Sequence, residues 1–304
     1  MVFIRERKKG VTTYYEAVET VRENGKVSQK TLQYLGSRRK MLDYCKRHGV
    51  KPPNESELLD EHTATMLEKK LVRLNRMRPL SPITLESLRK KFEVEMTYNS
   101  NAIEGNRLSL KETFLVLEKG MTIGGKSVKE HLEAVNHKEA ISFLEKLANK
   151  KTKIKEADIL QLHSIIMSKI DPQNAGFYRQ VQVYISQSRH RPPSFKEVPK
   201  LMKRVLSELN SKEEGRKAVE SAAKLHHLFV WIHPFADGNG RVARLLTNLR
   251  LMRATFPPIV LQKKIRMTYY RALETGDNGD LRPLASLIAR DVGRALDLYL
   301  EAAG

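Results

Sequence analysis

The sequence predicts a mainly α-helical protein preceded by a small antiparallel β-rich module. Three observations support this fold class. Short runs of alternating β-prone residues fill roughly residues 1–36. From residue 57 onward, apolar residues recur at i, i+3 and i+4, which is the spacing of an amphipathic helix. A hydrophobic content of 40% in 304 residues is enough for a core and for about two domains.

The first fifty residues form the predicted accessory module. Its strands are VFIRER, YYEAVETV and KVSQKTLQYLG, and Asn24-Gly25 between the last two is a strong hairpin signal. The following run SRRKMLDYCKRHG predicts a basic helix. Residues 1–50 hold 12 Lys or Arg against 5 Asp or Glu, a net charge of +7. The Pro-Pro run KPPNESE, residues 51–57, predicts a linker to the rest of the chain.

The remainder divides into a first helical part, residues 58–125, and a core, residues 126–304. Ser109 and Glu112 form a capping box that opens one helix of the first part. Segment 176–193 interrupts the helical pattern, because Val181, Val183 and Ile185 alternate with polar residues before a Pro-Pro stop. That alternation predicts a β-hairpin. Further helices are predicted over 127–149, 155–169, 196–210, 214–231, 241–255, 262–275 and 281–302.

The net charge of +20 predicts an anionic partner: nucleic acid, a phosphate-bearing small molecule or an acidic protein surface. No run approaches the roughly 18 apolar residues of a membrane-spanning helix, so no membrane partner is expected. The N-terminus lacks the apolar core of a secretion signal. Cys45 is the single cysteine and cannot form an internal disulfide. We therefore expect a cytoplasmic protein.

Residues 233–244 carry the clearest chemical pattern. Pro234 ends an apolar helix, and Asp237-Gly238-Asn239-Gly240 follows as a tight turn before a new helix. A glycine-rich turn at a helix N-terminus directs free backbone N–H groups and the positive end of the helix dipole toward an anion. This turn is therefore a candidate phosphate cradle.

Charged and titratable side chains surround that cradle. Arg241 and Arg244 are three residues apart on the first helical turns, and two guanidinium groups suit a polyphosphate. Asp237 offers a hard oxygen ligand for Mg²⁺. His233 can accept a proton near neutral pH. Each residue alone has an ordinary structural explanation, but all of them fall within twelve residues.

The run HPFADGNGRVAR, residues 233–244, resembles the complete signature of the Fic family, HxFx(D/E)GNGRxxR. The likeness extends over roughly residues 80–295. The resemblance implies a helical Fic domain that transfers AMP from ATP to a protein hydroxyl. It also implies ATP and an unknown target protein as partners, and a homodimer. The Doc-type kinases of the family lack the second arginine, so Arg244 favours adenylylation.

The resemblance also implies a role for each residue of the signature. His233 would be the base that deprotonates a Ser, Thr or Tyr hydroxyl of the target. Asp237 would hold Mg²⁺ on the α- and β-phosphates. The phosphates would lie against Gly238, Asn239, Gly240, Arg241 and Arg244, with Arg244 on the γ-phosphate.

A second run resembles the inhibitory helix motif (S/T)xxxE(G/N) of the same family. Ser100 and Glu104 lie four residues apart, on one face of a helix that Gly105 would end. A Glu104 carboxylate delivered to Arg244 would occupy the guanidinium that the γ-phosphate needs. The resemblance thus implies a self-inhibited, class II-like enzyme.

Two further segments resemble parts of Fic domains. Residues 176–193 resemble the flap, whose Val181, Val183 and Tyr184 would hold the target segment by strand addition. Tyr269 and Tyr270 resemble the segment near the adenine, although a helix-face tyrosine pair also suits a core.

Other functions compete with this prediction. Gly120–Ser127 matches the P-loop pattern, but the preceding run predicts a helix where a P-loop requires a buried strand. A zinc site at His226, His227, His233 and Asp237 has little support, because Pro234 breaks the helical register. Two alternatives stay open: removal of AMP from a target, with Glu104 orienting a water, or a nucleic-acid-binding regulator with a vestigial Fic site. The second rests on the basic module, which vaguely resembles the leading segment of some transposase-like proteins.

Overall fold

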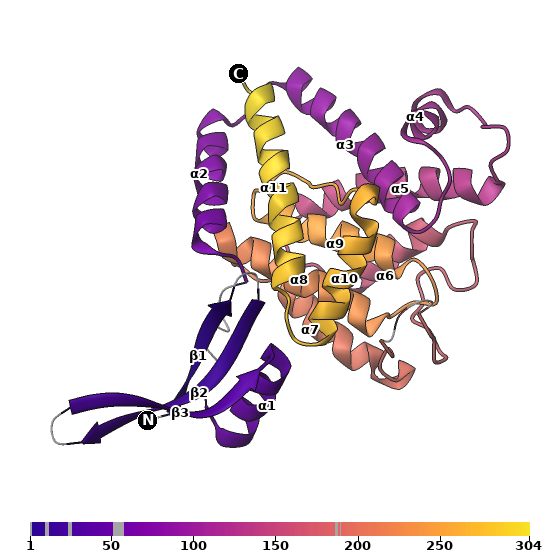
Figure 1. Cartoon of the computed structure of the whole chain (residues 1–304). Coiled ribbons are helices and arrows are strands. Elements are labelled where there is room, and N and C mark those ends of the chain that lie inside the picture. Colours follow the sequence, from indigo (N-terminus) through magenta and orange to yellow (C-terminus); the bar gives the residue numbers. More distant parts are fainter. Residues whose placement is uncertain (1, 10–11, 24–25, 51–57, 186–187, 189) are drawn as a thin grey trace.

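The computed structural model describes residues 2–9, 12–23, 26–50, 58–185, 188 and 190–304. A helical body carries a small β-rich module at one side, which confirms the predicted fold class (Figure 1). The module contains β1 (Val2–Lys9), β2 (Thr12–Glu23), β3 (Lys26–Gly36) and α1 (Arg38–His48). The body contains α2 (Glu61–Met77), α3 (Pro82–Ile103), α4 (Leu110–Lys119), α5 (Val128–Ala148), α6 (Glu156–Met167), α7 (Val198–Leu209), α8 (Gly215–Ile232), α9 (Asn239–Arg253), α10 (Arg266–Asp277) and α11 (Arg282–Ala302), with short 3₁₀ turns at Phe195–Glu197 and Lys263–Ile265.

The three strands form one antiparallel sheet in the order β1-β2-β3. One face is apolar and packs on α1 through Ile4, Tyr15, Ala17, Leu35, Met41, Tyr44 and Cys45. Burial of this face supplies the packing partner that a three-stranded sheet needs. The predicted Asn24-Gly25 turn and the predicted linker 51–57 lie outside the described residues.

The module touches the body at the loop between α10 and α11. Glu6 lies 3.6 Å from Arg282, whose guanidinium also holds Asp280 at 2.9 Å. A Cβ added to Gly279 would lie 3.0 Å from the Leu42 side chain of α1, so this loop approaches α1 closely.

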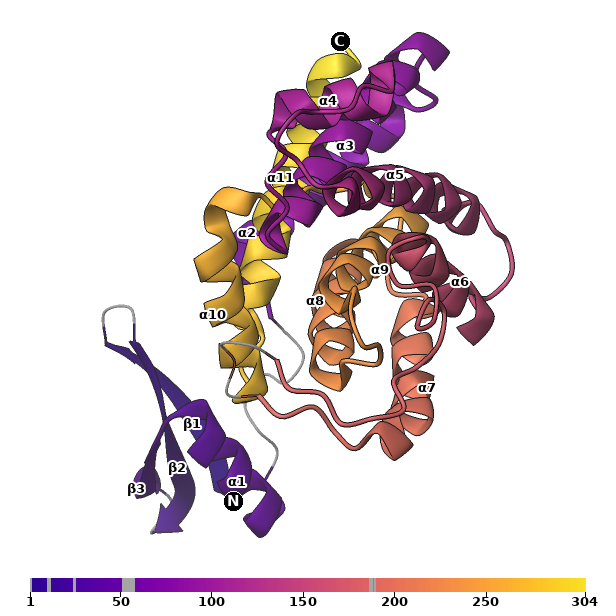
Figure 2. The same cartoon turned by 90° about the vertical axis from the view of Figure 1, so that its right-hand side faces the viewer.

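The centre of the body is the pair α8 and α9, around which α5, α6, α7 and α11 pack (Figures 1 and 2). Most residues of α9 are buried, including Val242, Leu245 and Leu249. One hydrophobic core joins residues of both predicted parts, such as Leu67 of α2 and Phe229 of α8. None of the described helices combines the length and apolar composition needed to cross a membrane.

The helix ends obey local rules that position the later site. Ser81 caps α3 and Pro82 occupies its first turn, while Gly105 follows the other end at φ +104°. The predicted capping box of α4 is present. Gly120 ends α4, and Ser127 caps α5. The P-loop pattern is therefore a helix-to-helix connection, as the sequence predicted.

The predicted β-hairpin at 176–193 is wrong for the described residues of that segment, which contain no strand. The side chains of Val181 and Tyr184 are 63% and 80% exposed, so the alternating residues do not bury one face of a strand against the body. Side chains tie the two arms instead. Gln182 Nε2 donates to the Pro192 carbonyl at 2.9 Å, and Arg179 contacts both arms.

Candidate active site

The loop of residues 233–239, called the catalytic loop after its predicted role, connects α8 to α9 and is held together by the Asn239 side chain. His233 ends α8 in the left-handed region, at φ +51°, with its N–H donated to the Phe229 carbonyl at 3.0 Å. Gly238 is also left-handed, at φ +79°, and precedes α9. Asn239 accepts from the Phe235 N–H and donates to the Phe235 carbonyl, both at 2.9 Å. The Asn239 side chain thus holds the loop in shape. The backbone of the turn is left to form the predicted phosphate cradle.

Phe235 anchors this loop in the core and is fully buried. Its ring stacks on His163 of α6 with the centroids 3.6 Å apart. The Gly176 N–H donates to His163 Nδ1 at 2.9 Å, so Nε2 carries the proton that is donated to the Asp237 carbonyl at 3.1 Å. Burial lowers the pKa of His163 to about 4, which keeps this tautomer neutral. Our sequence reasoning missed His163.

His233 is placed to act as a neutral base. Burial is the main cause that lowers its pKa to about 4; the nearby Arg179 and His190 also disfavour the imidazolium, whereas Glu104 favours it. Nδ1 lies 3.4 Å from the Val230 carbonyl, so a proton on Nδ1 leaves Nε2 as the acceptor. The imidazole is therefore in its proton-accepting form at neutral pH.

His233 lines a cavity of about 590 Å³. Asp237, Gly238, Asn239 and Gly240 also line it. Further lining comes from α10, including Tyr269, Tyr270 and Asp277, and from Tyr184 of the predicted flap. The volume suits a ligand of drug or nucleotide size. The structure thus brings most of the predicted residues to one cavity.

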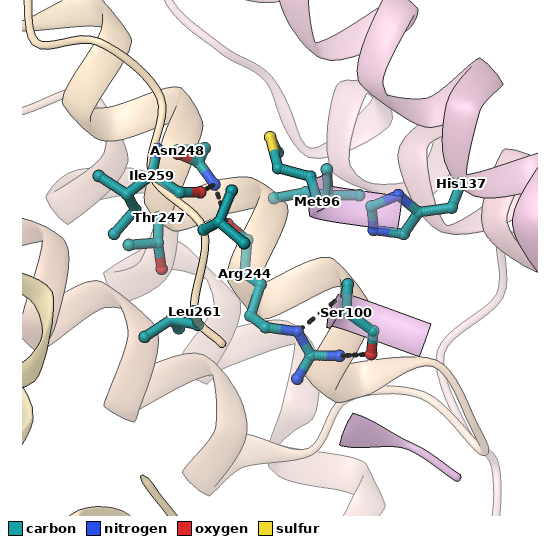
Figure 3. Close-up of a pocket in the computed structure, with 10 residues that line it drawn as sticks. Met96, Ser100, His137, Arg244, Thr247, Asn248, Ile259 and Leu261 are labelled. Carbon is teal, nitrogen blue, oxygen red and sulfur yellow. Dashed lines mark hydrogen bonds between the residues drawn. The ribbon is translucent and has the colours of Figure 1, made fainter. Parts of the chain in front are cut away.

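Arg244 is held by the predicted inhibitory helix. Its Nε donates to Ser100 Oγ and its Nη2 to the Ser100 carbonyl, each at 2.9 Å (Figure 3). Nη2 also donates to Glu104 Oε1 at 2.7 Å. Arg244 is 5% exposed, and its Nη1 is buried with no partner among the described residues. The guanidinium is therefore engaged by α3 on one side.

Glu104 also covers the glycine turn. A Cβ added to Gly240 would overlap the Glu104 carboxylate and lie 3.1 Å from Arg244 Nη1. The acid therefore sits directly on the backbone of the predicted phosphate cradle. The side chain of Glu104 is 35% exposed and lines the cavity.

Arg241 and Asp237 form a looser pair. Arg241 Nη2 lies 3.5 Å from Asp237 Oδ1, and Nη1 lies 3.5 Å from Glu133. Arg241 is buried, whereas the Asp237 side chain is 56% exposed. In the described part of the chain, no group of three or more His, Cys, Asp or Glu side chains is arranged to hold a metal. A lone exposed carboxylate does fit Mg²⁺, which takes most of its ligands from phosphates and water.

Tyr269 and Tyr270 differ in their surroundings. Tyr269 is buried, with its hydroxyl 2.8 Å from His226 Nε2, and His226 Nδ1 lies 2.8 Å from Thr247 Oγ1. Tyr270 is half-buried and donates its hydroxyl to the Ile103 carbonyl, at the end of α3, at 3.2 Å. Tyr269 therefore belongs to the core as well as to the cavity wall, and Tyr270 links α10 to the inhibitory helix.

Comparison with known proteins matches two family models. The Fic/DOC family model matches residues 153–251. The model of the IS1634 family transposase, N-terminal domain, matches residues 3–52.

Curated relatives named protein adenylyltransferase Fic cover most of the chain. The protein of Aedes aegypti is 39% identical over 264 residues, which is 82% of this chain and 52% of the relative. That of Nematostella vectensis is 36% identical over 244 residues, 80% of this chain and 56% of the relative. The chain thus spans about half the length of the curated relatives it matches.

Solved structures agree. Residues 134–508 of Fic-1 from C. elegans superpose with a TM-score of 0.71 and 34% identity, covering 79% of this chain and 72% of that one. A Fic domain containing signaling protein from Bacteroides thetaiotaomicron also gives a TM-score of 0.71, with 29% identity over 79% of this chain and 96% of that one. On this sequence and structural similarity, the chain belongs to the Fic family.

Proposed function

We propose that this protein is an adenylyltransferase that transfers AMP from ATP to a Ser, Thr or Tyr hydroxyl of another protein. The observation that carries the proposal is the shared cavity: a neutral His233, the exposed Asp237 and the Gly238–Gly240 turn all face one space of about 590 Å³. The names of the curated relatives support the same reaction.

In this reaction the target hydroxyl attacks the α-phosphorus of ATP and pyrophosphate leaves. His233 Nε2 takes the proton of the hydroxyl as the new P–O bond forms. The Gly238–Gly240 backbone, at the N-terminus of α9, stabilises negative charge on the phosphates. Asp237 would hold Mg²⁺, which would neutralise phosphate charge when bound. The work of the protein is mostly positioning and charge neutralisation.

The resting state in this proposal is self-inhibited by Glu104. Its carboxylate lies 2.7 Å from Arg244 Nη2 and covers Gly240, where a phosphate would have to lie. A nucleotide can bind productively only after this contact opens, so the rate depends on the population of the open state.

The test is incubation with α-³²P-labelled ATP and Mg²⁺, using the parent, Glu104→Gly and Glu104→Gly/His233→Ala. We expect a host lysate or the protein itself to be labelled by Glu104→Gly, faintly by the parent and not by the double variant. Mass spectrometry of the lysate then identifies the acceptor. Absence of label with folded Glu104→Gly would refute the proposal.

Removal of AMP from a modified target is a second candidate, favoured by the cavity-lining position of Glu104. In that reaction the carboxylate would orient a water for attack on the phosphorus. The two candidates make opposite predictions for Glu104→Gly: it releases a transferase but abolishes a hydrolase. Cytoplasmic location and self-association stay predictions.

Nucleic acid is a proposed partner of the accessory module, in addition to the transfer reaction. The transposase-type match at 3–52 favours it. The registers place Arg5, Glu16 and Tyr34 on one face of the sheet, where Tyr14 packs against the 64% exposed Tyr34 at 5.5 Å. Arginines beside exposed aromatic rings suit a phosphate backbone with stacked bases.

Fluorescence anisotropy with labelled single- and double-stranded DNA tests this partner. Binding should weaken as salt rises, and Tyr34→Ala should weaken it on the single strand. Lys153→Glu, an exposed charge change on the α5–α6 loop, is the control. If Tyr34→Ala and the control bound single-stranded DNA equally well, this face of the sheet would be excluded as the DNA-binding surface.

A further inference from the structure

One buried arginine outside the signature, Arg179, joins the catalytic loop to the flap segment. Arg179 is 4% exposed. Its Nε donates to the His233 carbonyl at 2.8 Å, and its own N–H donates to the Pro234 carbonyl at 2.9 Å. Nη1 donates to the Val181 carbonyl at 3.0 Å and Nη2 to the Pro193 carbonyl at 2.6 Å. The first two acceptors belong to the catalytic loop, and the last two belong to opposite arms of the flap.

These contacts fall where the backbone needs them. The last carbonyls of a helix have no partner within it, and a cation at that end also interacts favourably with the helix dipole. Here α8 ends in a non-glycine residue at φ +51°, a conformation that surrounding structure has to hold. The Arg179 side chain holds the carbonyl of His233, and the Arg179 backbone N–H holds the carbonyl of the next residue, Pro234. The direction in which the His233 imidazole leaves the chain is thereby set.

We propose that Arg179 is a positioning residue for the transfer reaction: it fixes the backbone of His233 and, through the same guanidinium, the flap that would present the target. The inference rests on the proposed function but concerns a residue that the family signature does not include. Arg179 bonds to main-chain carbonyls, so it acts through His233 and the flap. One side chain then sets the relative position of the base and the target segment.

The geometry requires an arginine. A guanidinium has five N–H donors in one plane and reaches carbonyls in several directions, whereas a lysine has one nitrogen at the end of a flexible chain. Arg179→Lys keeps the charge and most of the volume but cannot make the same set of bonds. This substitution therefore separates positioning from charge.

The chain offers a matched control. Arg253, at the end of α9, donates to the Leu147, Lys150 and Thr152 carbonyls at 3.3, 2.8 and 3.3 Å. Like Arg179, it binds several backbone carbonyls, but it does not line the cavity. Arg253→Lys therefore measures how much activity is lost when such carbonyl contacts are weakened away from the site.

The experiment compares Arg179→Lys and Arg253→Lys, both in Glu104→Gly, by single-turnover AMP transfer and by calorimetric binding of a non-hydrolysable ATP analogue. We expect Arg179→Lys to lower kcat about 10- to 100-fold, because a misplacement of about 1 Å can cost that much. Its analogue Kd should change less than about twofold. Arg253→Lys should leave both within about twofold. Equal kcat values for the two variants would overturn the proposal.

A second readout does not depend on transfer. The ¹⁵N resonances of the His233 imidazole, assigned by comparison with His233→Ala, report its environment and titration. Arg179, His190 and Glu104 are the charged or titratable groups that act on this ring. Arg179→Lys should shift these resonances and change the titration midpoint, whereas Arg253→Lys should not. Unchanged His233 resonances would overturn the proposal even if no transfer reaction is found.

A variant at an exposed residue perturbs the flap alone and is not expected to unfold the protein. Gln182 is exposed and ties only the two flap arms, through the Pro192 carbonyl. Gln182→Ala should raise the KM for the protein target and leave the His233 resonances unchanged. If Arg179→Lys does not fold, Arg179→Gln, which retains one amide donor, replaces it, and unchanged His233 resonances in that variant would count against the proposal.

Discussion

The two ends of the signature run, residues 233–244, are held in opposite ways. At the His233 end, Arg179 and the Asn239 side chain bond to backbone groups, and the imidazole is left facing the cavity in its neutral form. At the Arg244 end, the guanidinium itself is bound: it donates to Ser100 of α3 and to Glu104, which caps that helix. The His233 imidazole thus faces the cavity, whereas the Arg244 guanidinium is already bound by Ser100 and Glu104.

Under the proposed function, this difference locates the control of the protein. None of the contacts described at the His233 end would have to break before a substrate binds, whereas the contact between Glu104 and Arg244 would have to open. A restraint confined to a few side chains of one helix end can be released without unfolding the core.

The largest effect is expected at the base. His233→Ala, made in Glu104→Gly, should lower the AMP-transfer rate about 10²- to 10⁴-fold, which is the usual contribution of a general base. Binding of an ATP analogue should stay the same, because in the proposed reaction the phosphates are bound by the Gly238–Gly240 turn and the arginines of α9, not by His233. Rapid-quench kinetics and calorimetry measure the two quantities. A comparable loss of analogue binding would contradict the separation of the two ends.

Release of the occupied end should come next in size. A hydrogen bond to a charged group is worth about 1.5–3 kcal/mol, so Glu104→Gly should raise transfer roughly 10- to 100-fold over the parent. Ser100→Ala removes the acceptor of Arg244 Nε but keeps the acid, and should raise transfer only about two- to fivefold. Initial rates with labelled ATP rank the two variants. The reverse order would place the restraint on Ser100.

A smaller effect should follow from the contact between α10 and the inhibitory helix. Tyr270→Phe removes the bond to the Ile103 carbonyl, worth about 1 kcal/mol, and should raise the parent rate up to about fivefold. The same substitution in Glu104→Gly should have no effect, because the restraint is already gone. An equal gain in both backgrounds would show that Tyr270 acts on the nucleotide.

The smallest effect is expected from pH. An ordinary histidine, with a pKa near 6.5, would lose most of its basic form as pH falls from 8 to 6. The His233 pKa of about 4 keeps the imidazole neutral over that range, so kcat of Glu104→Gly should vary less than about twofold. The rate should fall only as pH drops toward 4, where the base becomes protonated. If kcat instead fell with a midpoint near pH 6.5, the His233 ring would be exposed to water during turnover, which would contradict the prediction.

Local pattern predicted much of the fold, and the departures have physical reasons. The helical period from residue 57, the capping box at Ser109 and the Gly105 stop all describe the observed helices. The i, i+4 spacing of Ser100 and Glu104 does place both on Arg244, although the effect on catalysis stays a prediction. The hairpin failed because alternation specifies a strand only where one face is buried.

Contacts between side chains and distant backbone could not be predicted in the same way. Arg179 bonds to carbonyls, which every residue has, so no partner residue in the sequence marks its role. His163 lies over seventy residues before the loop that it supports. Asn239 was predicted to bind phosphate, but its amide is engaged by Phe235, four residues earlier. Such bonds become visible only when the fold brings the groups together.

The closeness of Glu104 to Gly240 has a consequence for how the protein can be switched on. The carboxylate occupies the volume that a single methyl group on Gly240 would fill. Protonating the acid, or replacing it with glutamine, would change its charge but leave that volume filled. Under the proposed self-inhibition, a trigger would therefore have to displace the end of α3, and a change in the charge of Glu104 alone would not clear the turn.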